Sequence, residues 1–323
     1  MSDRWTWHGG GLTAARAHYG DGDWIDLSTG INPHPWAGVD ALTFDWQRLP
    51  DESGLRDLEV AAAAHFGAEP AYVCAVPGSE IGLRLTGQLL GESGLWAEPA
   101  YRTHGDVLRD ARPLPFDRID AADGRSLILA NPNNPDGRLI DRAAMRDLLA
   151  RRGEGWLLID EAFADAHSEC SLVGEVGDRR LIVFRSFGKF FGLAGVRLGF
   201  VIGPRAIVDR LRALIGAWPL SAAAVAIGAA AYRDRDWIDR TGPLLRNDAA
   251  ALDRLLCQRG YVPQGACPLF RLIETKDARD LFERLAMAKI LTRPFAEHPR
   301  WLRIGLPGGA DELARLDAAL GGV

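Results

Sequence analysis

The chain has 323 residues, of which 47% are apolar, enough to form the core of one large α/β domain with a second, smaller unit. The net charge of -5 is spread without acidic or basic blocks, so electrostatics gives no reason to expect nucleic acid or an anionic membrane as a partner. The expected partner is a small molecule.

Between residues 55 and 203, short apolar runs alternate with amphipathic stretches, which indicates βαβ units and a mostly parallel sheet. The predicted helices cover residues 55–66, 79–90 and 141–152. The predicted strands cover residues 72–76, 95–97, 126–130, 156–159, 181–184 and 198–202.

After Pro219 the composition changes to a helical region rich in alanine and arginine that runs through residue 258. Short strands are expected near residues 269–273 and 302–306. We therefore predict an N-terminal arm with part of the small domain at residues 1–45, a large domain at 46–215, and a C-terminal small domain at 216–323. The apolar stretch at residues 213–232 is mostly alanine and glycine, so no membrane span is expected.

The cysteines and the N-terminal segment indicate a cytoplasmic protein. Four widely scattered cysteines include no CxxC pair, which argues against a zinc site and a disulfide framework. The seven histidines also lack metal-ligand spacing, so no metal is expected. The first twenty residues carry charges, tryptophan and glycine where a signal peptide needs a continuous apolar stretch.

Lysine is rare in this chain, because Lys189, Lys276 and Lys289 are the only lysines among 38 basic residues. A guanidinium stays protonated and is a poor nucleophile, whereas a desolvated lysine can lose its proton and form a Schiff base. Lys276 and Lys289 lie in polar or amphipathic helical surroundings. Lys189 follows a predicted buried strand within SFGKFFGLAG, which favours a buried reactive amine; the alternative is a surface lysine in a loop.

Two segments are suited to binding a phosphate. Ser186, Lys189 and Arg197 combine a hydroxyl with two cations. Residues 78–80, Gly-Ser-Glu, begin a predicted helix directly after a strand, where free N–H groups and the helix dipole favour an anion. An ordinary helix cap is the alternative interpretation of residues 78–80.

Two predicted strands end in polar residues. The sequence NPNNPDG at residues 131–137 follows one strand, and its prolines and glycine predict a rigid turn that presents a side-chain amide. Asp160 and Glu161 end the next strand, and Asp160 is expected at the same edge of the sheet. A carboxylate there can pair with a protonated ring nitrogen, although a helix or turn cap is the alternative.

Together these motifs resemble the class I pyridoxal-phosphate aminotransferases, over most of the chain. The resemblance is greatest to the histidinol-phosphate aminotransferase branch, whose NPNNPxG, DEA(Y/F) and SxxKxxGLAGxRxG motifs stand here as NPNNPDG, DEAF and SFGKFFGLAGVRLG. It implies fold type I, which is a mostly parallel seven-stranded sheet sandwiched by helices, with a smaller α+β domain. It also implies a homodimer and pyridoxal 5'-phosphate as the cofactor.

The resemblance assigns roles residue by residue. Lys189 would hold the cofactor covalently, Asp160 would pair with its ring nitrogen and Tyr101 would stack on its ring, so these three are the expected catalytic residues. The other expected cofactor-binding residues are Gly78, Ser79, Glu80, Asn134, Ser186 and Arg197. In the substrate, Arg303 would bind the carboxylate in a bidentate pair and Arg293 would reach a phosphate.

Two positions depart from the family pattern. Phe163 stands where most aminotransferases have a tyrosine that donates to the phenolic oxygen of the cofactor. Leu49 stands where a tyrosine of the partner subunit normally contacts the cofactor phosphate. Both departures argue against ordinary transamination.

A narrower resemblance concerns the sequences HGGG at residues 8–11, DLSTGINP at 26–33 and LFRL at 269–272, which look like those of the threonine-phosphate decarboxylases of cobalamin biosynthesis. It implies that His8 lies over the substrate phosphate and that Asn32 helps to hold the carboxylate; a solvated N-terminal histidine is the alternative for His8.

The implied reaction converts L-threonine O-3-phosphate to (R)-1-amino-2-propanol O-2-phosphate and carbon dioxide. The bond at Cα that lies perpendicular to the cofactor ring decides the reaction type, so a histidinol-phosphate or related aminotransferase is the alternative. A non-catalytic binding protein of the same fold is a more remote one.

Overall fold

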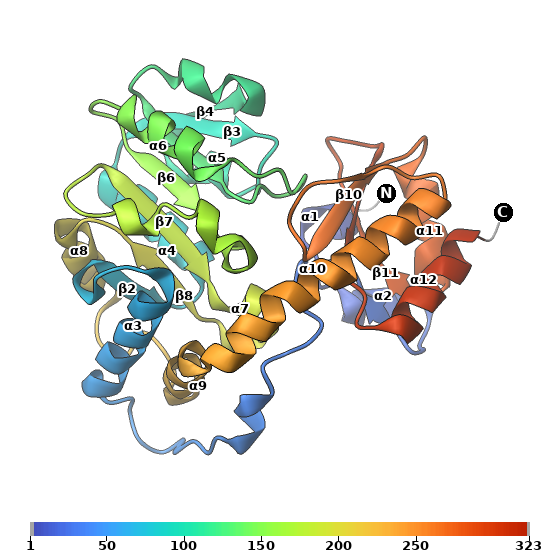
Figure 1. The fold of residues 1–323 in the computed structure, drawn as a ribbon, viewed down its shortest axis with the longest axis horizontal. Helices are drawn as coiled ribbons and strands as arrows, with labels where there is room; N and C mark the ends of the chain where they lie inside the picture. The colour runs from blue at the N-terminus through green and yellow to red at the C-terminus, as the bar shows by residue number, and fades with distance from the viewer. Residues whose placement is uncertain (1–2, 322–323) are drawn as a thin grey trace. The chain divides into compact units, whose positions relative to one another are not determined.

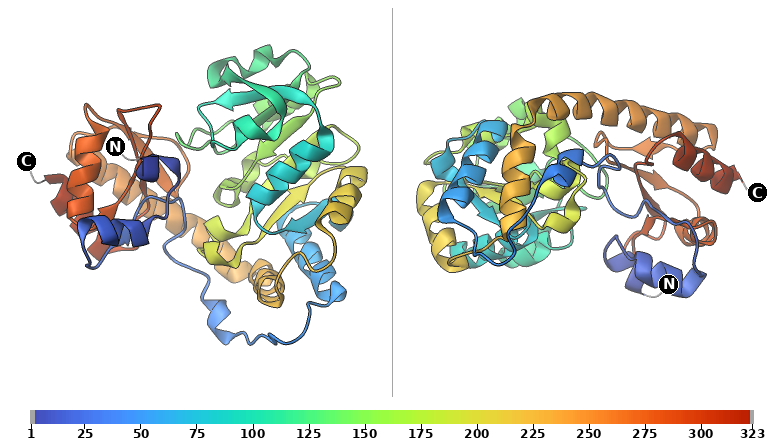
Figure 2. Two further views of the ribbon diagram at one scale, coloured as in Figure 1. Left: turned by 180° about the vertical axis from the view of Figure 1, so that it is seen from behind. Right: turned by 90° about the horizontal axis from the view of Figure 1, so that it is seen from below.

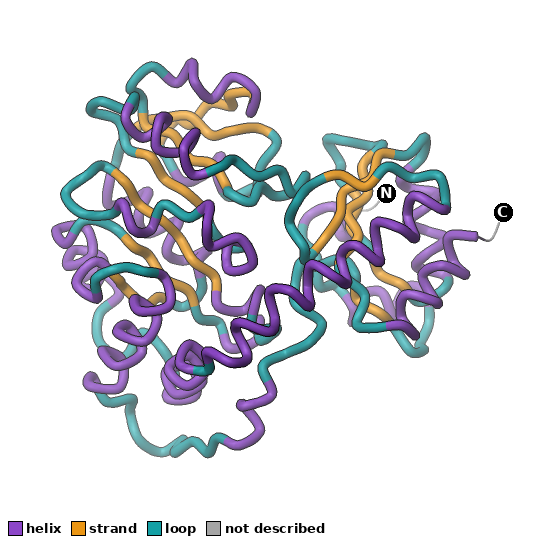
Figure 3. The backbone as a smooth tube through the Cα atoms, viewed as in Figure 1, coloured by secondary structure: helices purple, strands orange, loops and turns teal. Residues whose placement is uncertain are grey.

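The computed structural model describes residues 3–321, which divide into two compact units (Figure 1). The larger unit comprises Pro35–Asn134 and Leu139–Arg240. The smaller unit comprises Met1–His34, Pro135–Arg138 and Thr241–Val323. Figure 3 shows that each unit contains its own sheet.

The larger unit is built on a seven-stranded sheet with the strand order β2-β8-β7-β6-β5-β3-β4. Strand β8 pairs antiparallel with both of its neighbours, and the other pairs are parallel. This confirms the predicted mostly parallel sheet. The strands are β2 (Val73–Val76), β3 (Ser93–Glu98), β4 (Arg109–Pro115), β5 (Ser126–Ala130), β6 (Leu157–Asp160), β7 (Leu181–Ser186) and β8 (Gly199–Ile202).

Helices cover both faces of this sheet (Figures 1 and 2). On one face, Phe184 of β7 belongs to a core cluster with Leu83 of α4 and Leu211 of α8. On the other face, the guanidinium of Arg185 lies 4.7 Å from the ring of Phe66 in α3, as the alternation of side chains along β7 requires. The helices are α3 (Glu52–Phe66), α4 (Ser79–Leu90), α5 (His104–Val107), α6 (Arg142–Ala150), α7 (Phe187–Phe190), α8 (Arg205–Ile215) and α9 (Ala222–Arg233).

The smaller unit contains a four-stranded antiparallel sheet with the order β12-β13-β10-β9 and a parallel pair of β1 with β11. This is the predicted smaller α+β fold. Its strands are β1 (Ile25–Asp26), β9 (Pro263–Gln264), β10 (Phe270–Glu274), β11 (Ile290–Leu291), β12 (Arg293–Pro294) and β13 (Trp301–Gly305). Its helices are α1 (Asp3–Trp7), α2 (Leu12–Tyr19), α11 (Ala278–Met287), α12 (Ala310–Gly321) and the greater part of α10 (Arg235–Gln258).

The boundary between the units lies further along the chain than residue 215, where the change in composition placed it. Helix α9 belongs to the larger unit, because it packs against α3. The change to alanine-rich sequence therefore marks a helix of the large unit, and the second unit resumes at Thr241. None of the helices within residues 3–321 combines the length and the hydropathy needed to cross a membrane.

Candidate active site

Lys189 lies in the short helix α7, directly after β7, and its side chain is half-buried among aromatic rings. Its Nζ atom is 5.7 Å from the centre of the Phe163 ring. The rings of Phe187 and Phe191 stack at 4.6 Å with an interplanar angle of 13°. These buried rings hold the turn that carries Lys189.

Asp160 ends β6 and is 7% exposed. Its Oδ1 accepts the N–H of Ala162 at 3.0 Å, and its Oδ2 lies 3.2 Å from Nε2 of His104. His104 is fully buried, and its Nδ1 has no hydrogen-bond partner among residues 3–321. Both carboxylate oxygens are therefore held, which fixes the orientation of Asp160.

His104 is a residue of the site that the sequence did not predict. It begins α5, three residues after Tyr101, and the two rings meet edge to face at 5.9 Å and 87°. The sequence signal was its spacing of one helical turn from an aromatic residue already assigned to the site. Taken alone, that spacing is too common to be informative.

Tyr101 is half-buried, and burial followed by the nearby Glu80 carboxylate raises the pKa of its hydroxyl to about 12. The Glu80 carboxylate accepts the hydroxyl of Thr103 at 3.0 Å and the Nε–H of Arg84 at 2.7 Å. Through Thr103, Glu80 holds the segment that carries Tyr101. Because a carboxylate repels a phosphate, any part of Glu80 in phosphate binding would be played by its backbone N–H.

The start of α4 forms a narrow backbone turn beside Arg197. A Cβ atom at Gly78, whose φ is +86°, would lie 2.8 Å from Nη2 of Arg197. A Cβ at Gly199 would lie 2.3 Å from the amide nitrogen of Ser79. Arg197 itself has a left-handed backbone with φ of +58°, which is a strained conformation for a residue with a side chain. Only glycines allow this approach, which leaves the first N–H groups of α4 beside a guanidinium.

Ser186 belongs to the same corner, because it is the register partner of Gly199 on β8. Gly199 therefore has Ser186 beside it within the sheet and the Ser79 amide where its own Cβ would lie. The predicted phosphate-binding residues Gly78, Ser79, Ser186 and Arg197 are thus neighbours in the structure.

Asn134 is half-buried at the end of a loop held by asparagine side chains. Asn131 both donates to and accepts from the backbone of Ile140, at 2.9 Å each. Asn133 is fully buried and donates to the carbonyl of Pro99 at 2.9 Å. The loop is the rigid turn that the sequence predicted, and it starts next to Asp160, since the N–H of Asn131 binds the Asp160 carbonyl at 3.0 Å.

In the smaller unit, Arg293 on β12 and Arg303 on β13 are direct register partners. Like charges placed opposite each other on antiparallel strands destabilise the sheet. Arg303 is 6% exposed, and burial followed by the charge of Arg293 lowers its pKa to about 9. It donates to the Ser28 carbonyl at 2.9 Å, and Arg293 donates to the Trp7 carbonyl at 3.1 Å. An anion bound at this pair would relieve the repulsion.

His8 and Asn32 lie in the same unit as this arginine pair. His8 is exposed after α1, and the glycines that follow it pack on Ser28. A Cβ at Gly9 would lie 2.3 Å from the Ser28 carbonyl oxygen, and the N–H of Gly10 binds the Ser28 hydroxyl at 2.8 Å. Asn32 is buried, and its side-chain oxygen accepts the N–H of His34 at 2.8 Å.

The groups gathered in the larger unit match the parts of pyridoxal 5'-phosphate. Lys189 offers an amine to the aldehyde, Asp160 a carboxylate to the ring nitrogen, and Tyr101 a ring to stack on. The Gly78 turn with Arg197 offers a cradle for the phosphate, which a Cβ at Gly78 would fill. The residues therefore fit this cofactor. Among the described residues, no group of three or more His, Cys, Asp or Glu side chains is placed to hold a metal ion.

Comparison with known proteins agrees with this geometry. Residues 23–316 match the model of the family Aminotransferase class I and II. The chain belongs to this family. It is therefore an enzyme that uses pyridoxal 5'-phosphate, as the resemblance of its motifs implied.

Two relatives in this family are similar along almost their whole length. The chain is 39% identical over 325 residues to a threonine-phosphate decarboxylase from Sinorhizobium sp, with 97% of each chain covered. It is 38% identical over 330 residues to a threonine-phosphate decarboxylase from Pseudomonas aeruginosa, covering 97% of this chain and 96% of the relative.

A solved structure supports the fold. The histidinol-phosphate aminotransferase from Sinorhizobium meliloti, in complex with pyridoxal-5'-phosphate, has a TM-score of 0.83 to this chain at 20% identity, covering 95% of this chain and 92% of its own. This confirms the predicted fold class.

Proposed function

We propose that this enzyme decarboxylates L-threonine O-3-phosphate to (R)-1-amino-2-propanol O-2-phosphate, as a step of cobalamin biosynthesis. The observation that carries the proposal is the pairing of Arg293 with Arg303 in register on β12 and β13. Two adjacent cations suit a small substrate with two anionic groups, a carboxylate and a phosphate. The two relatives named as threonine-phosphate decarboxylases support the same substrate.

Each side chain has a defined task in this proposal. Arg303 and Asn32 hold the substrate carboxylate, and Arg293 and His8 hold its phosphate. The Cα–carboxylate bond breaks, carbon dioxide leaves and a proton takes its place at Cα. Bound pyridoxal 5'-phosphate supplies the electron sink for the electron pair that this bond leaves behind. Held at two points, the substrate can present only one bond at Cα to the cofactor, which is how binding selects the reaction.

Phe163 supports decarboxylation over amino transfer. Its ring lies beside Lys189, at 5.7 Å from Nζ, where a tyrosine would bring a hydroxyl. One hydrogen bond that tunes the cofactor in transaminating relatives is therefore absent. A histidinol-phosphate aminotransferase is the second candidate, favoured by the motifs around Asn134 and Lys189, and it also needs a phosphate-binding arginine.

The deciding experiment measures carbon dioxide release from threonine phosphate without any keto acid. Release at a steady rate is expected. If no gas forms and histidinol phosphate passes its amino group to 2-oxoglutarate, the aminotransferase candidate replaces the proposal. Borohydride should fix the cofactor to Lys189, and Lys189→Ala should abolish both labelling and turnover. Lys276→Ala is the matched control, since Lys276 lies in the smaller unit and should keep both.

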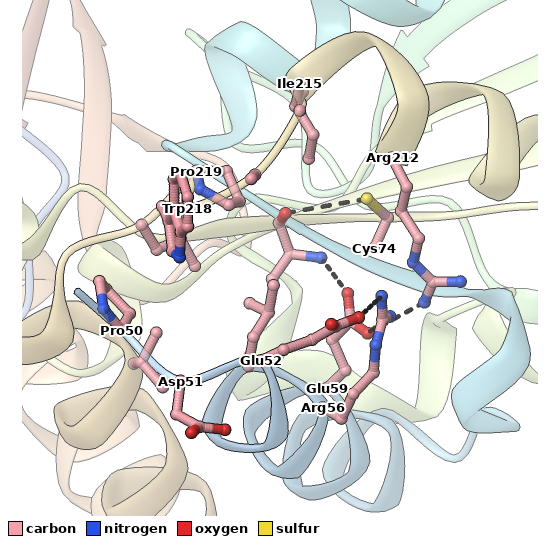
Figure 4. A pocket seen from close by; sticks show the side chains of 16 residues that line it. Pro50, Asp51, Glu52, Arg56, Glu59, Cys74, Arg212, Ile215, Trp218 and Pro219 are labelled. Atoms are coloured by element: carbon pink, nitrogen blue, oxygen red, sulfur yellow. Dashed lines mark hydrogen bonds and ion pairs between the residues drawn. The ribbon is translucent and has the colours of Figure 1, made fainter.

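We propose that the enzyme is a homodimer to which Leu49 contributes from the partner subunit. In the larger unit Trp46, Leu49 and Trp218 are 74%, 65% and 59% exposed, and large exposed apolar side chains often mark an interface. Trp218 lines a cavity of about 320 Å³ together with Pro50 and Pro219 (Figure 4). Sedimentation should give a dimer at working concentration, and an active monomer would overturn this part.

The remaining parts of the proposal concern location and partners. The four cysteines are free, as suits a reducing cytoplasm. The partners proposed are the phosphorylated amino acid and a second copy of the chain, with no nucleic acid and no membrane.

A further inference from the structure

Four ionisable side chains form a buried cluster in the larger unit, next in sequence to the proposed cofactor contacts. Arg185 donates to Glu161 at 3.0 Å and to Asp165 at 2.6 Å. Asp165 also lies 2.9 Å from Nε2 of His65 in α3. The side chains of Arg185, Glu161 and Asp165 are 2%, 1% and 4% exposed.

The cluster is directly joined to the proposed site through the backbone. Arg185 precedes Ser186 on β7, and Glu161 follows Asp160 at the end of β6. The N–H of Glu161 binds the carbonyl of Phe184 at 2.9 Å, so the two strand ends are paired at this point. Because side chains alternate along β7, Arg185 and Ser186 point to opposite faces of the sheet.

The same cluster holds the segment that carries Phe163. The Glu161 carboxylate accepts the hydroxyl of Ser171 at 2.6 Å and the N–H of Leu172 at 2.9 Å. Asp165 is bound at the start of the same segment, in the 3-10 helix Ala164–Cys170. Arg185 thus fixes the chain on both sides of Phe163, whose ring lies beside Lys189.

Stability alone is a poor reason for such a cluster. Taking charges out of water is costly, and buried ion groups replaced by packed apolar residues are often as stable or more so. Burial raises the pKa of Glu161 even though Arg185 opposes the change. For Asp165, Arg185 and His65 outweigh the effect of burial and lower the pKa. Burial thus opposes the charge of Glu161, and Arg185, Ser171 and the N–H of Leu172 hold its carboxylate in place.

We propose that Arg185, acting through Glu161 and Asp165, is a positioning residue that sets Asp160 and Phe163 toward the cofactor. This inference rests on the proposed function, which gives Asp160 and Lys189 their roles toward the cofactor. Arg185 acts because Nη1 and Nη2 of its planar guanidinium reach two separate carboxylates in a fixed geometry. A lysine has a single nitrogen on a flexible stem and does not reproduce that geometry. Replacing the guanidinium of Arg185 should therefore change how the cofactor is bound while the protein stays folded.

The test compares Arg185→Lys and Glu161→Gln with Arg152→Lys. Arg152 is also a buried arginine of the larger unit, 1% exposed, but it donates to the backbone carbonyls of Leu148 and Arg125. Arg125 directly precedes the start of β5, whereas the loop that carries Asn134 follows the other end of this strand. Each protein is loaded with pyridoxal phosphate. The measurements are the dissociation constant of the cofactor, the circular dichroism of its visible band, and urea unfolding.

Arg185→Lys and Glu161→Gln should weaken cofactor binding about ten-fold and change the visible circular dichroism, as expected when a buried charge-assisted bond is lost. Arg152→Lys should lower stability to a similar extent but keep the wild-type constant and band. If the Arg185 and Glu161 variants keep both wild-type values, Arg185 is structural only and the inference is wrong. Wild-type protein that bound no pyridoxal phosphate would instead overturn the proposed function, and this inference with it.

Discussion

The Nε2 atom of His104 lies 3.2 Å from Oδ2 of Asp160, within the buried part of the larger unit. The other carboxylate oxygen accepts the backbone N–H of Ala162. Asp160 can therefore turn neither away from its strand nor toward solvent. In the proposed function, His104 would act on the cofactor indirectly, by holding the carboxylate that is expected to pair with the ring nitrogen.

Replacing His104 by leucine should weaken binding of pyridoxal phosphate by about ten-fold or more, because a hydrogen bond to a buried charged group contributes roughly 1.5–3 kcal/mol. His104→Gln should keep most of the affinity, since its side-chain amide can place a donor near the former Nε2. Titration of the cofactor into the apoenzyme measures both. Wild-type affinity in His104→Leu would show that Asp160 is held without it.

Gly78→Ala should disrupt the phosphate cradle. The residue has φ of +86° and ψ of 147°, a conformation almost confined to glycine, and the new Cβ would meet Nη2 of Arg197 at 2.8 Å. The affinity for pyridoxal phosphate should fall more than the stability does. Gly67→Ala is the control, because Gly67 also has positive φ, +75°, but nothing lies within 4 Å of its Cβ position. It should cost about 1 kcal/mol of stability and leave cofactor affinity unchanged. Equal losses of affinity in the two variants would contradict the cradle.

Buried apolar runs allowed several elements to be predicted almost residue for residue. The helix at 79–90 and the strand at 126–130 coincide with α4 and β5. Strand β4 was missed, because it lies at the edge of the sheet and its residues are mostly exposed, with Arg109, Asp110 and Arg112 among them. Strand β4 therefore lacks the buried pattern from which strands are predicted, whereas β2, at the other edge of the sheet, is buried throughout and was predicted.

Some residues of the candidate site could likewise be predicted from the sequence and others could not. Motifs predicted Lys189, Asp160 and Arg197, because their spacing along the chain is itself the signal. His104 and Arg185 were not assigned to the site, since each acts through a partner that is distant in sequence. His104 and Asp160 are 56 positions apart, and the fold brings the start of α5 to the end of β6.

Arg293→Ala should reduce the specificity constant for threonine phosphate by about ten-fold to a hundred-fold, the loss expected for a charge-assisted contact of roughly 1.5–3 kcal/mol. The rate with unphosphorylated threonine, which is expected to be low in the unsubstituted enzyme, should change little. Arg300→Ala is the matched control, because Arg300 is an exposed arginine of the same unit that pairs with Glu274 at 3.3 Å. An equal loss with phosphorylated and unphosphorylated substrates would mean that Arg293 does not recognise the phosphate.

Arg303 should make substrate binding depend on pH in the alkaline range. The pKa of Arg303 is lowered to about 9, mainly because the side chain is buried and secondly because Arg293 is positively charged. In the proposed function the substrate carboxylate binds the protonated guanidinium of Arg303, so the affinity should be full below about pH 9 and fall as the pH rises through that value. In the free protein the folded pKa lies below the unfolded one, so this group destabilises the fold most when it is charged, and its cost diminishes as the pH rises above about 9. Arg293→Ala removes the neighbouring positive charge and should therefore raise the pH at which half of the affinity is lost. The pH at which half of the affinity is lost is measured by calorimetric titration of threonine phosphate into Lys189→Ala, which is expected to bind the substrate without turnover. The same titration is repeated with Arg293→Ala added. An affinity that is level across this range in both proteins would show that Arg303 stays charged and that Arg293 does not act on it.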